Sequence, residues 1–210
     1  MSPFFKTPIR RSAKNEHMSI HTFFLDTASD VVGVVKGADT ADLGSATPCT
    51  EFELKKLVNH FIGTTGALAR AGRRESLDPE DPYGSKKDST GGDWQSVLAA
   101  NIEDLGRAWT QPEAWQGSVD LGSASMPARM IGEMAYAELV LHGWDLARAT
   151  GQELTVPEDV AAELRRSIEE TAELGRSMGA YGDAVDVSDG ESEFARALGA
   201  SGRDPRWPER

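Results

Sequence analysis

Residues 137–147 read Ala-Glu-Leu-Val-Leu-His-Gly-Trp-Asp-Leu-Ala, an apolar run interrupted by a glutamate, a histidine and an aspartate. The run belongs to the most strongly helical pattern of the chain, from 127 to 150, and Gly151 is a typical helix stop. On a helix, Glu138 and His142 lie four residues apart on one face. Because their neighbours are apolar, both side chains are expected to point inward or into a cleft, where each needs a partner.

Helical periodicity predicts further helices at 21–36, 50–69, 93–109 and 158–174, and a short one around 194–198. Thr50 and Glu53 have the spacing of a capping box, which places the start of the second helix at Thr50. Pro127 suits the first position of the helix that carries Glu138. Residues 71–92 read as a long surface loop. Four or five long helices with few strand signals predict an all-α bundle, in which metal sites form between facing helices.

Composition restricts the class of protein. The chain has 210 residues, of which 34 are acidic and 22 basic, giving a net charge of −12. This charge argues against nucleic acid or an anionic membrane as the main partner. The single cysteine, Cys49, excludes an intramolecular disulfide and favours the reducing cytoplasm. No apolar run approaches the ~20 residues of a membrane span. Residues 1–17, polar and basic, are expected to be a disordered extension, with 18–210 forming one domain.

A metal site is the sharpest functional hypothesis. His60 lies at the edge of the apolar stripe of the second predicted helix, whereas two other histidines lie near the start of the chain. Together, His60, Glu138 and His142 would give two imidazoles and one carboxylate, with a position left open for water or substrate, as in catalytic zinc sites. The alternative is that Glu138 pairs with Arg129 or Arg148 on a helix surface and that both histidines are ordinary ones.

Three further residues near this site have two readings each. Asp145, three residues after His142, either orients an imidazole or a bound water, as a supporting catalytic residue, or pairs with Arg148 or a helix terminus. Trp144 is expected to pack in the core or an interface rather than to stack on a substrate. Cys49 precedes a helix start, which favours a thiolate, but a buried inert thiol is the expectation.

Several segments resemble one family. Residues 47–52, Thr-Pro-Cys-Thr-Glu-Phe, and 57–60, Leu-Val-Asn-His, resemble the start of the second helix in mycothiol-dependent maleylpyruvate isomerase N-terminal domains. Residues 138–151 resemble the most characteristic segment of these domains. Residues 202–205, Gly-Arg-Asp-Pro, are similar to the close of short, single-domain actinobacterial members. The resemblance covers roughly residues 18–206.

The resemblance implies a DinB-like four-helix bundle with long loops and a short C-terminal helix. It also implies a divalent metal bound by His60, Glu138 and His142, the same three residues reached from spacing. Zinc is the favoured ion and nickel the alternative. The last ligand helix of DinB-like proteins often carries His-x-x-x-His, and Glu138 takes the first of those positions, as in the isomerase branch.

The chemistry implied by the family is a metal-activated thiol: mycothiol, as cosubstrate, binds the metal as thiolate and adds to an electrophile. The isomerase carries a further C-terminal domain, for which the sequence after the last predicted helix is too short. A metal-dependent thiol S-transferase or isomerase-like enzyme is therefore expected rather than the isomerase itself. A small-molecule thiol and an electrophile are the expected partners.

Two other functional classes stay open from the sequence. One is a non-catalytic metal-binding bundle of the stress-response kind, and the other is a helical interaction protein without metal. Both a monomer and a homodimer are compatible with the sequence.

Overall fold

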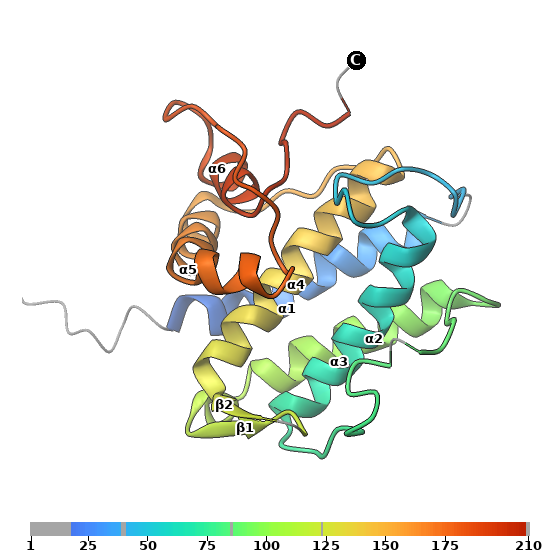
Figure 1. Ribbon diagram of the computed structural model, residues 1–210, viewed down its shortest axis with the longest axis vertical. Coiled ribbons are helices and arrows are strands. Elements are labelled where there is room, and N and C mark those ends of the chain that lie inside the picture. Colours follow the sequence, from blue (N-terminus) through green and yellow to red (C-terminus); the bar gives the residue numbers. More distant parts are fainter. Residues whose placement is uncertain (1–17, 39–40, 85, 123, 209–210) are drawn as a thin grey trace, which may run out of the picture.

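Four helices form a bundle in this computed structural model, which describes residues 18–38, 41–84, 86–122 and 124–208 (Figure 1). They are α1 (Met18–Lys36), α2 (Leu54–Gly72), α3 (Trp94–Trp109) and α4 (Ala128–Ala149). Helices α1 and α2 each pack against both α3 and α4, which closes the bundle. The all-α prediction is confirmed. The disordered extension predicted for residues 1–17 falls outside the described residues.

Helix α4 is the central element. Every residue from 139 to 147 is buried, among them Trp144, which packs in the core as expected. A helix that is apolar on nearly all sides must be covered on nearly all sides. The Tyr136 hydroxyl of α4 lies 2.9 Å from Thr27 Oγ1 of α1. Polar groups placed on this helix therefore lie inside the protein and need partners from other elements.

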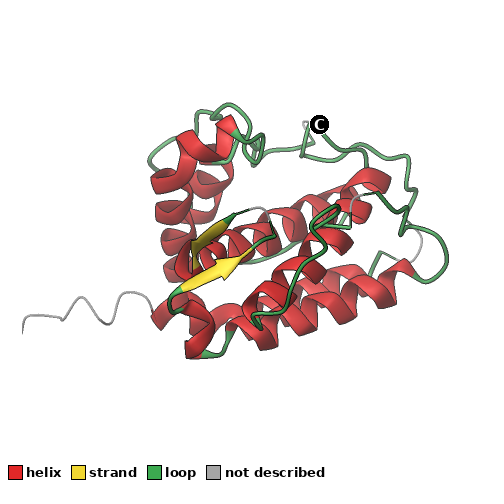
Figure 2. Cartoon of the chain, turned by 60° about the horizontal axis from the view of Figure 1, so that its bottom comes forward, coloured by secondary structure: helices red, strands yellow, loops and turns green. Residues whose placement is uncertain are grey.

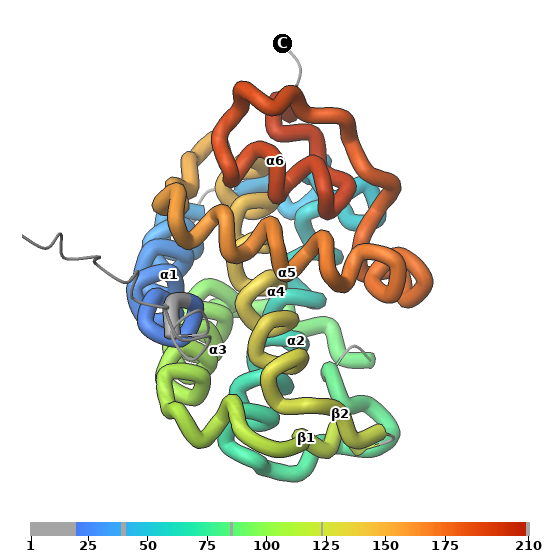
Figure 3. Tube along the Cα trace, turned by 90° about the vertical axis from the view of Figure 1, so that its left-hand side faces the viewer, coloured from blue at the N-terminus to red at the C-terminus, as the bar shows by residue number. Residues whose placement is uncertain are grey.

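Two further helices follow, and the first of them completes the cover of α4. Helix α5 (Glu158–Ser177) packs on α1 and α4, and α6 (Glu193–Ala200) packs on α5 (Figure 3). Ser192 is the N-cap of α6, and its hydroxyl accepts a hydrogen bond from the Ala195 amide at 3.1 Å. The chain after α6 returns to α4, where the buried side chain of Arg203 contacts Asp145.

A small hairpin precedes α4. After the short 3₁₀ helix η1 (Pro112–Trp115), strands β1 (Ser118–Asp120) and β2 (Ser125–Pro127) pair antiparallel (Figure 2). Pro127 therefore ends a strand and is the N-cap, and α4 begins one residue later than predicted. The guanidinium of Arg74 donates to backbone carbonyls of η1 and of the hairpin, which ties this region to the end of α2.

The predicted capping box at Thr50 is wrong. Helix α2 begins at Leu54, and its N-cap, Glu53, makes no side-chain capping hydrogen bond. The first amides of the helix instead donate to backbone carbonyls of the preceding loop: Leu54 to Ser45 at 2.9 Å and Lys55 to Leu43 at 2.8 Å. This loop folds back on the helix start and satisfies donors that a threonine would otherwise cap.

The loop after α2, predicted as a surface segment, lies against that helix. Its Ser89 amide donates to Asn59 Oδ1 at 2.6 Å. A Cβ atom at Gly63 would lie 1.9 Å from the Tyr83 carbonyl oxygen, so only glycine allows this approach. The loop therefore places Tyr83 beside the stretch of α2 that carries His60.

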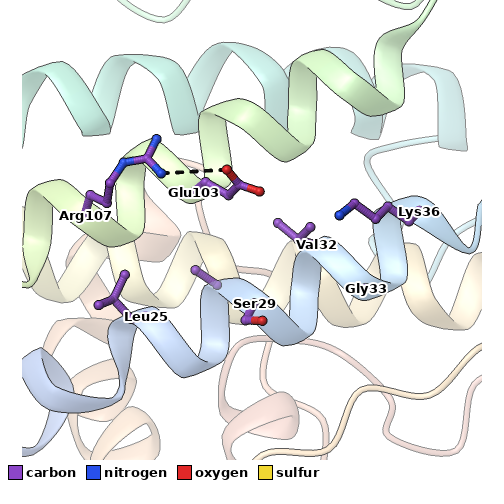
Figure 4. A pocket seen from close by; sticks show the side chains of 8 residues that line it. Leu25, Ser29, Val32, Gly33, Lys36, Glu103 and Arg107 are labelled. Atoms are coloured by element: carbon purple, nitrogen blue, oxygen red, sulfur yellow. Dashed lines mark ion pairs between the residues drawn. The ribbon is translucent and has the colours of Figure 1, made fainter.

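A groove of about 330 Å³ runs between α1 and α3, lined by residues such as Leu25, Val32 and Lys36 (Figure 4). Its only drawn ion pair joins Arg107 Nη1 and Glu103 Oε2 at 3.7 Å, within one helix (Figure 4). The groove holds no metal-ligand cluster among the described residues. None of the described helices is long and apolar enough to cross a membrane.

Candidate metal centre

Three polar side chains meet between α2 and α4. Nε2 of His60, on α2, lies 3.2 Å from Oε2 of Glu138, and Nε2 of His142 lies 3.3 Å from the same oxygen. The three donor atoms all lie within 4.8 Å of one another. The structure thus brings together the residues predicted as ligands, although His60 is 78 positions from Glu138.

Aromatic packing restrains the two imidazole rings. Their centroids lie 4.9 Å apart, with an angle of 78° between the ring planes. Phe52 lies 5.0 Å from the His60 ring, and Phe61 lies 5.8 Å from the His142 ring. Because apolar rings flank both imidazoles, few rotamers remain, and the observed ones aim both Nε2 atoms at the same carboxylate.

A second set of contacts holds His142 from behind. Its Nδ1 lies 2.9 Å from Oδ2 of Asp145, whose side chain is completely buried. Arg203, also buried, donates from Nε to Asp145 Oδ1 at 2.9 Å and from Nη2 to Oδ2 at 2.8 Å. Asp145 therefore contacts an imidazole, as one reading of the sequence proposed.

The two arginines considered as surface partners of Glu138 contact other groups instead. Arg129 pairs with Glu133 one turn away, at 2.9 Å. The guanidinium of Arg148 donates from Nε to the Trp207 carbonyl at 2.9 Å. Neither arginine forms the pairing with Glu138 that would have explained the sequence without a metal.

The charges of the cluster are strongly coupled. Burial raises the pKa of the Glu138 carboxyl, but the charge on His142 and hydrogen bonds from both imidazoles outweigh it and hold that pKa below its ordinary value. Burial lowers the pKa of His142, yet the carboxylates of Glu138 and Asp145 raise it to about 9. Burial likewise raises the pKa of Asp145, and Arg203 more than compensates. The carboxylates are therefore anions and His142 holds its proton tightly.

The donor set fits a divalent metal ion. Two imidazole nitrogens and one carboxylate oxygen are typical ligands of zinc and related ions, and three protein ligands leave a position for a further one. The hydrogen bond from Nδ1 of His142 to Asp145 selects the tautomer whose Nε2 carries the lone pair, and that atom faces the cluster.

Comparison with known proteins assigns the family. Residues 24–147 match the profile of the mycothiol maleylpyruvate isomerase N-terminal domain, which is more than half of the chain. The chain belongs to this family. Curated relatives of this family member include uncharacterised proteins from two strains of Mycobacterium tuberculosis, CDC 1551 and H37Rv, each 26% identical over 121 residues. Those matches cover 58% of the chain and 62% of each relative, so they span less than two thirds of the relatives' length.

Solved structures share the fold of this family member. A crystal structure of the mycothiol-dependent maleylpyruvate isomerase superimposes with a TM-score of 0.57 at 20% identity, covering 89% of both chains. A histidine-to-alanine mutant of that isomerase gives a TM-score of 0.56 at 19% identity, covering 83% of the chain and 77% of the mutant. The DinB-like bundle implied by the sequence resemblance is thus confirmed as the fold.

The cluster lies in the wall of a cavity of about 490 Å³. The cavity is lined by loop 48–52, helices α2 and α4, the turn 178–182 and residues 201–203. Much of the remaining wall is apolar or aromatic: Phe52, Tyr83, Met134, Met178 and Tyr181. A mostly apolar cavity with a few convergent polar groups is typical of small-molecule sites.

Cys49 also lines this cavity, half-buried. Burial raises the pKa of its thiol, against the opposing charge of Arg203. Since α2 begins at Leu54, Cys49 does not lie at a helix N-terminus, and the argument for a thiolate no longer applies.

Arg203 is a site residue for which the sequence predicted no role, although its Gly-Arg-Asp-Pro motif was part of the family resemblance.

Proposed function

We propose that this protein binds a divalent metal ion through His60, Glu138 and His142 and uses it to present a low-molecular-weight thiol to an electrophile. The convergence of the three donor atoms within 4.8 Å, in the wall of a ligand-sized cavity, carries the proposal. Zinc is the preferred ion, with nickel as the alternative. The family and its structural neighbours are described as mycothiol-dependent, which supports mycothiol as the thiol.

The chain's own residues have distinct tasks in this proposal. Both imidazoles and Glu138 hold the ion, which, when bound, stabilises a thiol ligand as thiolate near neutral pH. Asp145 keeps the proton of His142 on Nδ1, so that Nε2 stays a donor to the metal. Phe52 and Tyr181 exclude water from part of the cavity, which strengthens electrostatic interactions inside it.

The charge of the cavity favours thiol transfer over isomerisation of maleylpyruvate, a dicarboxylate. Among the described lining residues, Arg203 is the one arginine or lysine, and Asp145 binds it through two hydrogen bonds. Glu51 adds a negative charge at the rim. A dianion would therefore find no unpaired lysine or arginine among these residues and would depend on the metal ion alone, whereas a neutral electrophile needs neither.

Metal analysis tests the first half of the proposal. Purified protein should carry about one equivalent of zinc or nickel, as three-ligand sites do. The His60→Ala and His142→Ala variants should lose it, while the His21→Ala variant, altered outside the cluster, should keep it. Metal retained by both cluster variants would refute the ligand assignment.

Turnover tests the second half. Zinc-loaded protein should accelerate the reaction of mycothiol with a neutral electrophile such as a bromobimane, in which a C–S bond forms and bromide leaves. Protein that binds zinc but accelerates no thiol reaction across a panel of electrophiles would instead support the non-catalytic metal-binding bundle.

A further inference from the structure

The last described part of the chain, residues 201–208, contacts α4 through Arg203 and Trp207, and we call it the C-terminal strap. It leaves α6 and lines the cavity with residues 201–203, and beyond them the chain runs outward from the helices (Figure 1). Arg148 of α4 donates from Nε to the Trp207 carbonyl at 2.9 Å, which anchors the far end. The strap is therefore fixed to the same helix that carries Glu138 and His142.

The near end of the C-terminal strap has a conformation that only glycine supports easily. Gly202 has φ +88°, and a Cβ atom there would lie 2.6 Å from the Gly182 Cα. The next amide, of Arg203, donates to the Leu198 carbonyl at 2.9 Å and closes the end of α6. These contacts determine where the Arg203 side chain leaves the backbone.

Arg203 is 4% exposed and Asp145 is fully buried. Two hydrogen bonds join them, at 2.9 and 2.8 Å, one to each carboxylate oxygen. A two-point contact fixes the rotation of the carboxylate as well as its charge. Asp145 Oδ2 is shared, since it also lies 2.9 Å from Nδ1 of His142. Arg203 therefore fixes the orientation of the Asp145 carboxylate, and the carboxylate in turn fixes the orientation of the His142 ring.

We propose that Arg203 is a positioning residue of the metal centre, acting through Asp145 to hold the His142 ring in the orientation and tautomer that metal binding needs. The inference rests on the proposed metal binding. The competing explanation is that Arg203 only neutralises a buried carboxylate and stabilises the fold. The two differ in whether metal affinity and ligand geometry depend on the arginine beyond its effect on stability.

The first test measures metal affinity, by competition with a chromophoric chelator, and the visible absorption spectrum of cobalt-substituted protein. Arg203→Met should weaken zinc binding about 10–100-fold, as loss of residues that orient metal ligands does. It should also shift the cobalt bands, which report the ligand geometry. Arg203→Lys keeps the charge without the two-point contact and should recover only part of the affinity.

A double-variant cycle separates positioning from stability. If Arg203 acts through Asp145, adding Arg203→Met to Asp145→Asn should weaken zinc binding no further than Asp145→Asn alone. The double variant removes both buried charges, so it provides a folded protein even if Arg203→Met does not fold. Independent losses that multiply would overturn the proposal.

A matched glycine pair tests the C-terminal strap. Gly202→Ala and Gly151→Ala both place a side chain at positive φ, but only the first meets another backbone, since nothing lies within 4 Å of a Cβ at Gly151. Zinc affinity should fall in the Gly202 variant and stay unchanged in the Gly151 variant. Equal affinities in wild type, Arg203→Met and Gly202→Ala would overturn the inference while leaving metal binding intact. A wild type that binds no metal would overturn the proposed function and this inference with it.

Discussion

The affinity of the protein for zinc should rise steeply with pH, and His142 sets the range. Its pKa is raised to about 9 by the carboxylates of Glu138 and Asp145. In the metal-free protein, Nε2 of His142 therefore carries a proton at neutral pH, and zinc must displace this proton to bind. Glu138 adds no proton in this range, because its pKa is lowered.

The magnitude follows from this proton. At pH values below the His142 pKa of about 9, each fall of one pH unit should weaken the apparent zinc affinity about tenfold, which is about 1.4 kcal/mol. Between pH 7 and 9 the dissociation constant should fall about 50-fold, and above pH 9 it should level off at about a hundredth of its value at pH 7. An ordinary imidazole would instead level off near pH 6.5, since that is its unperturbed pKa.

The same proton acts on stability with the opposite sign. Because the folded-state pKa of His142 is raised, its contribution to the stability of the apoprotein is fully present below about pH 6.5 and is lost as the pH rises through about 9. Heating the apoprotein at several pH values should therefore show this contribution declining over the interval in which zinc binding strengthens. His142→Ala should remove both effects.

Titration with a zinc indicator, corrected for the indicator's own protonation, measures the profile. Asp145→Asn should move the plateau to lower pH, because one interaction that raises the pKa of His142 is removed. Glu193→Gln, whose carboxylate pairs with Arg165 at 2.6 Å on the outer helices, is the control and should leave the profile unchanged. Zinc affinity that stays constant between pH 7 and 9 in the wild type would refute the reasoning.

Three further results are expected. Tyr136→Phe should lower the free energy of unfolding, measured in urea, by about 1–3 kcal/mol, because the Thr27 hydroxyl loses its partner at 2.9 Å. The double variant with Thr27→Val should lose less stability than the sum of the two single variants, and strict additivity would contradict this. Trp109→Phe should cost about 1–3 kcal/mol, because its Nε1 donates to the Leu68 carbonyl at 3.0 Å; an unchanged unfolding midpoint would disprove it. Cys49 should react with iodoacetamide more slowly in native than in unfolded protein at neutral pH, and equal rates would argue against a buried thiol.

Helical periodicity was sufficient to predict the bundle and two of the three candidate ligands. Glu138 and His142 share a face because they lie one turn apart, which is a local property of any helix. His60 required more, since its helix had to pack against α4 at the right level. The apolar stripe around it predicted burial but not which helix would cover it. The family resemblance supplied that pairing in advance, and the structure shows the contact.

The predicted start of α2 was wrong because tertiary contacts, rather than a nearby side chain, cap this helix. The Thr50–Glu53 spacing is a sound capping pattern, but the loop from Leu43 to Ser45 supplies backbone carbonyls to the first amides of α2. Short-range sequence rules assume that a helix end must be capped by its own side chains. Wherever a loop folds back on a helix start, that assumption fails, and only the folded chain reveals it.

The sequence predicts that Asp145 needs a cation beside it, but not that Arg203 supplies it. Asp145 lies in a helix whose neighbours are apolar on nearly all sides, so the sequence already implies a buried carboxylate, and a buried carboxylate requires a cation or several donors. Twenty-two lysines and arginines are candidates, and Arg148 is favoured by its spacing alone. The actual partner lies 58 positions away, at the end of a turn that depends on the positive φ of Gly202. The requirement for a cation is thus local and predictable, whereas its source depends on a glycine turn whose geometry no periodic pattern encodes.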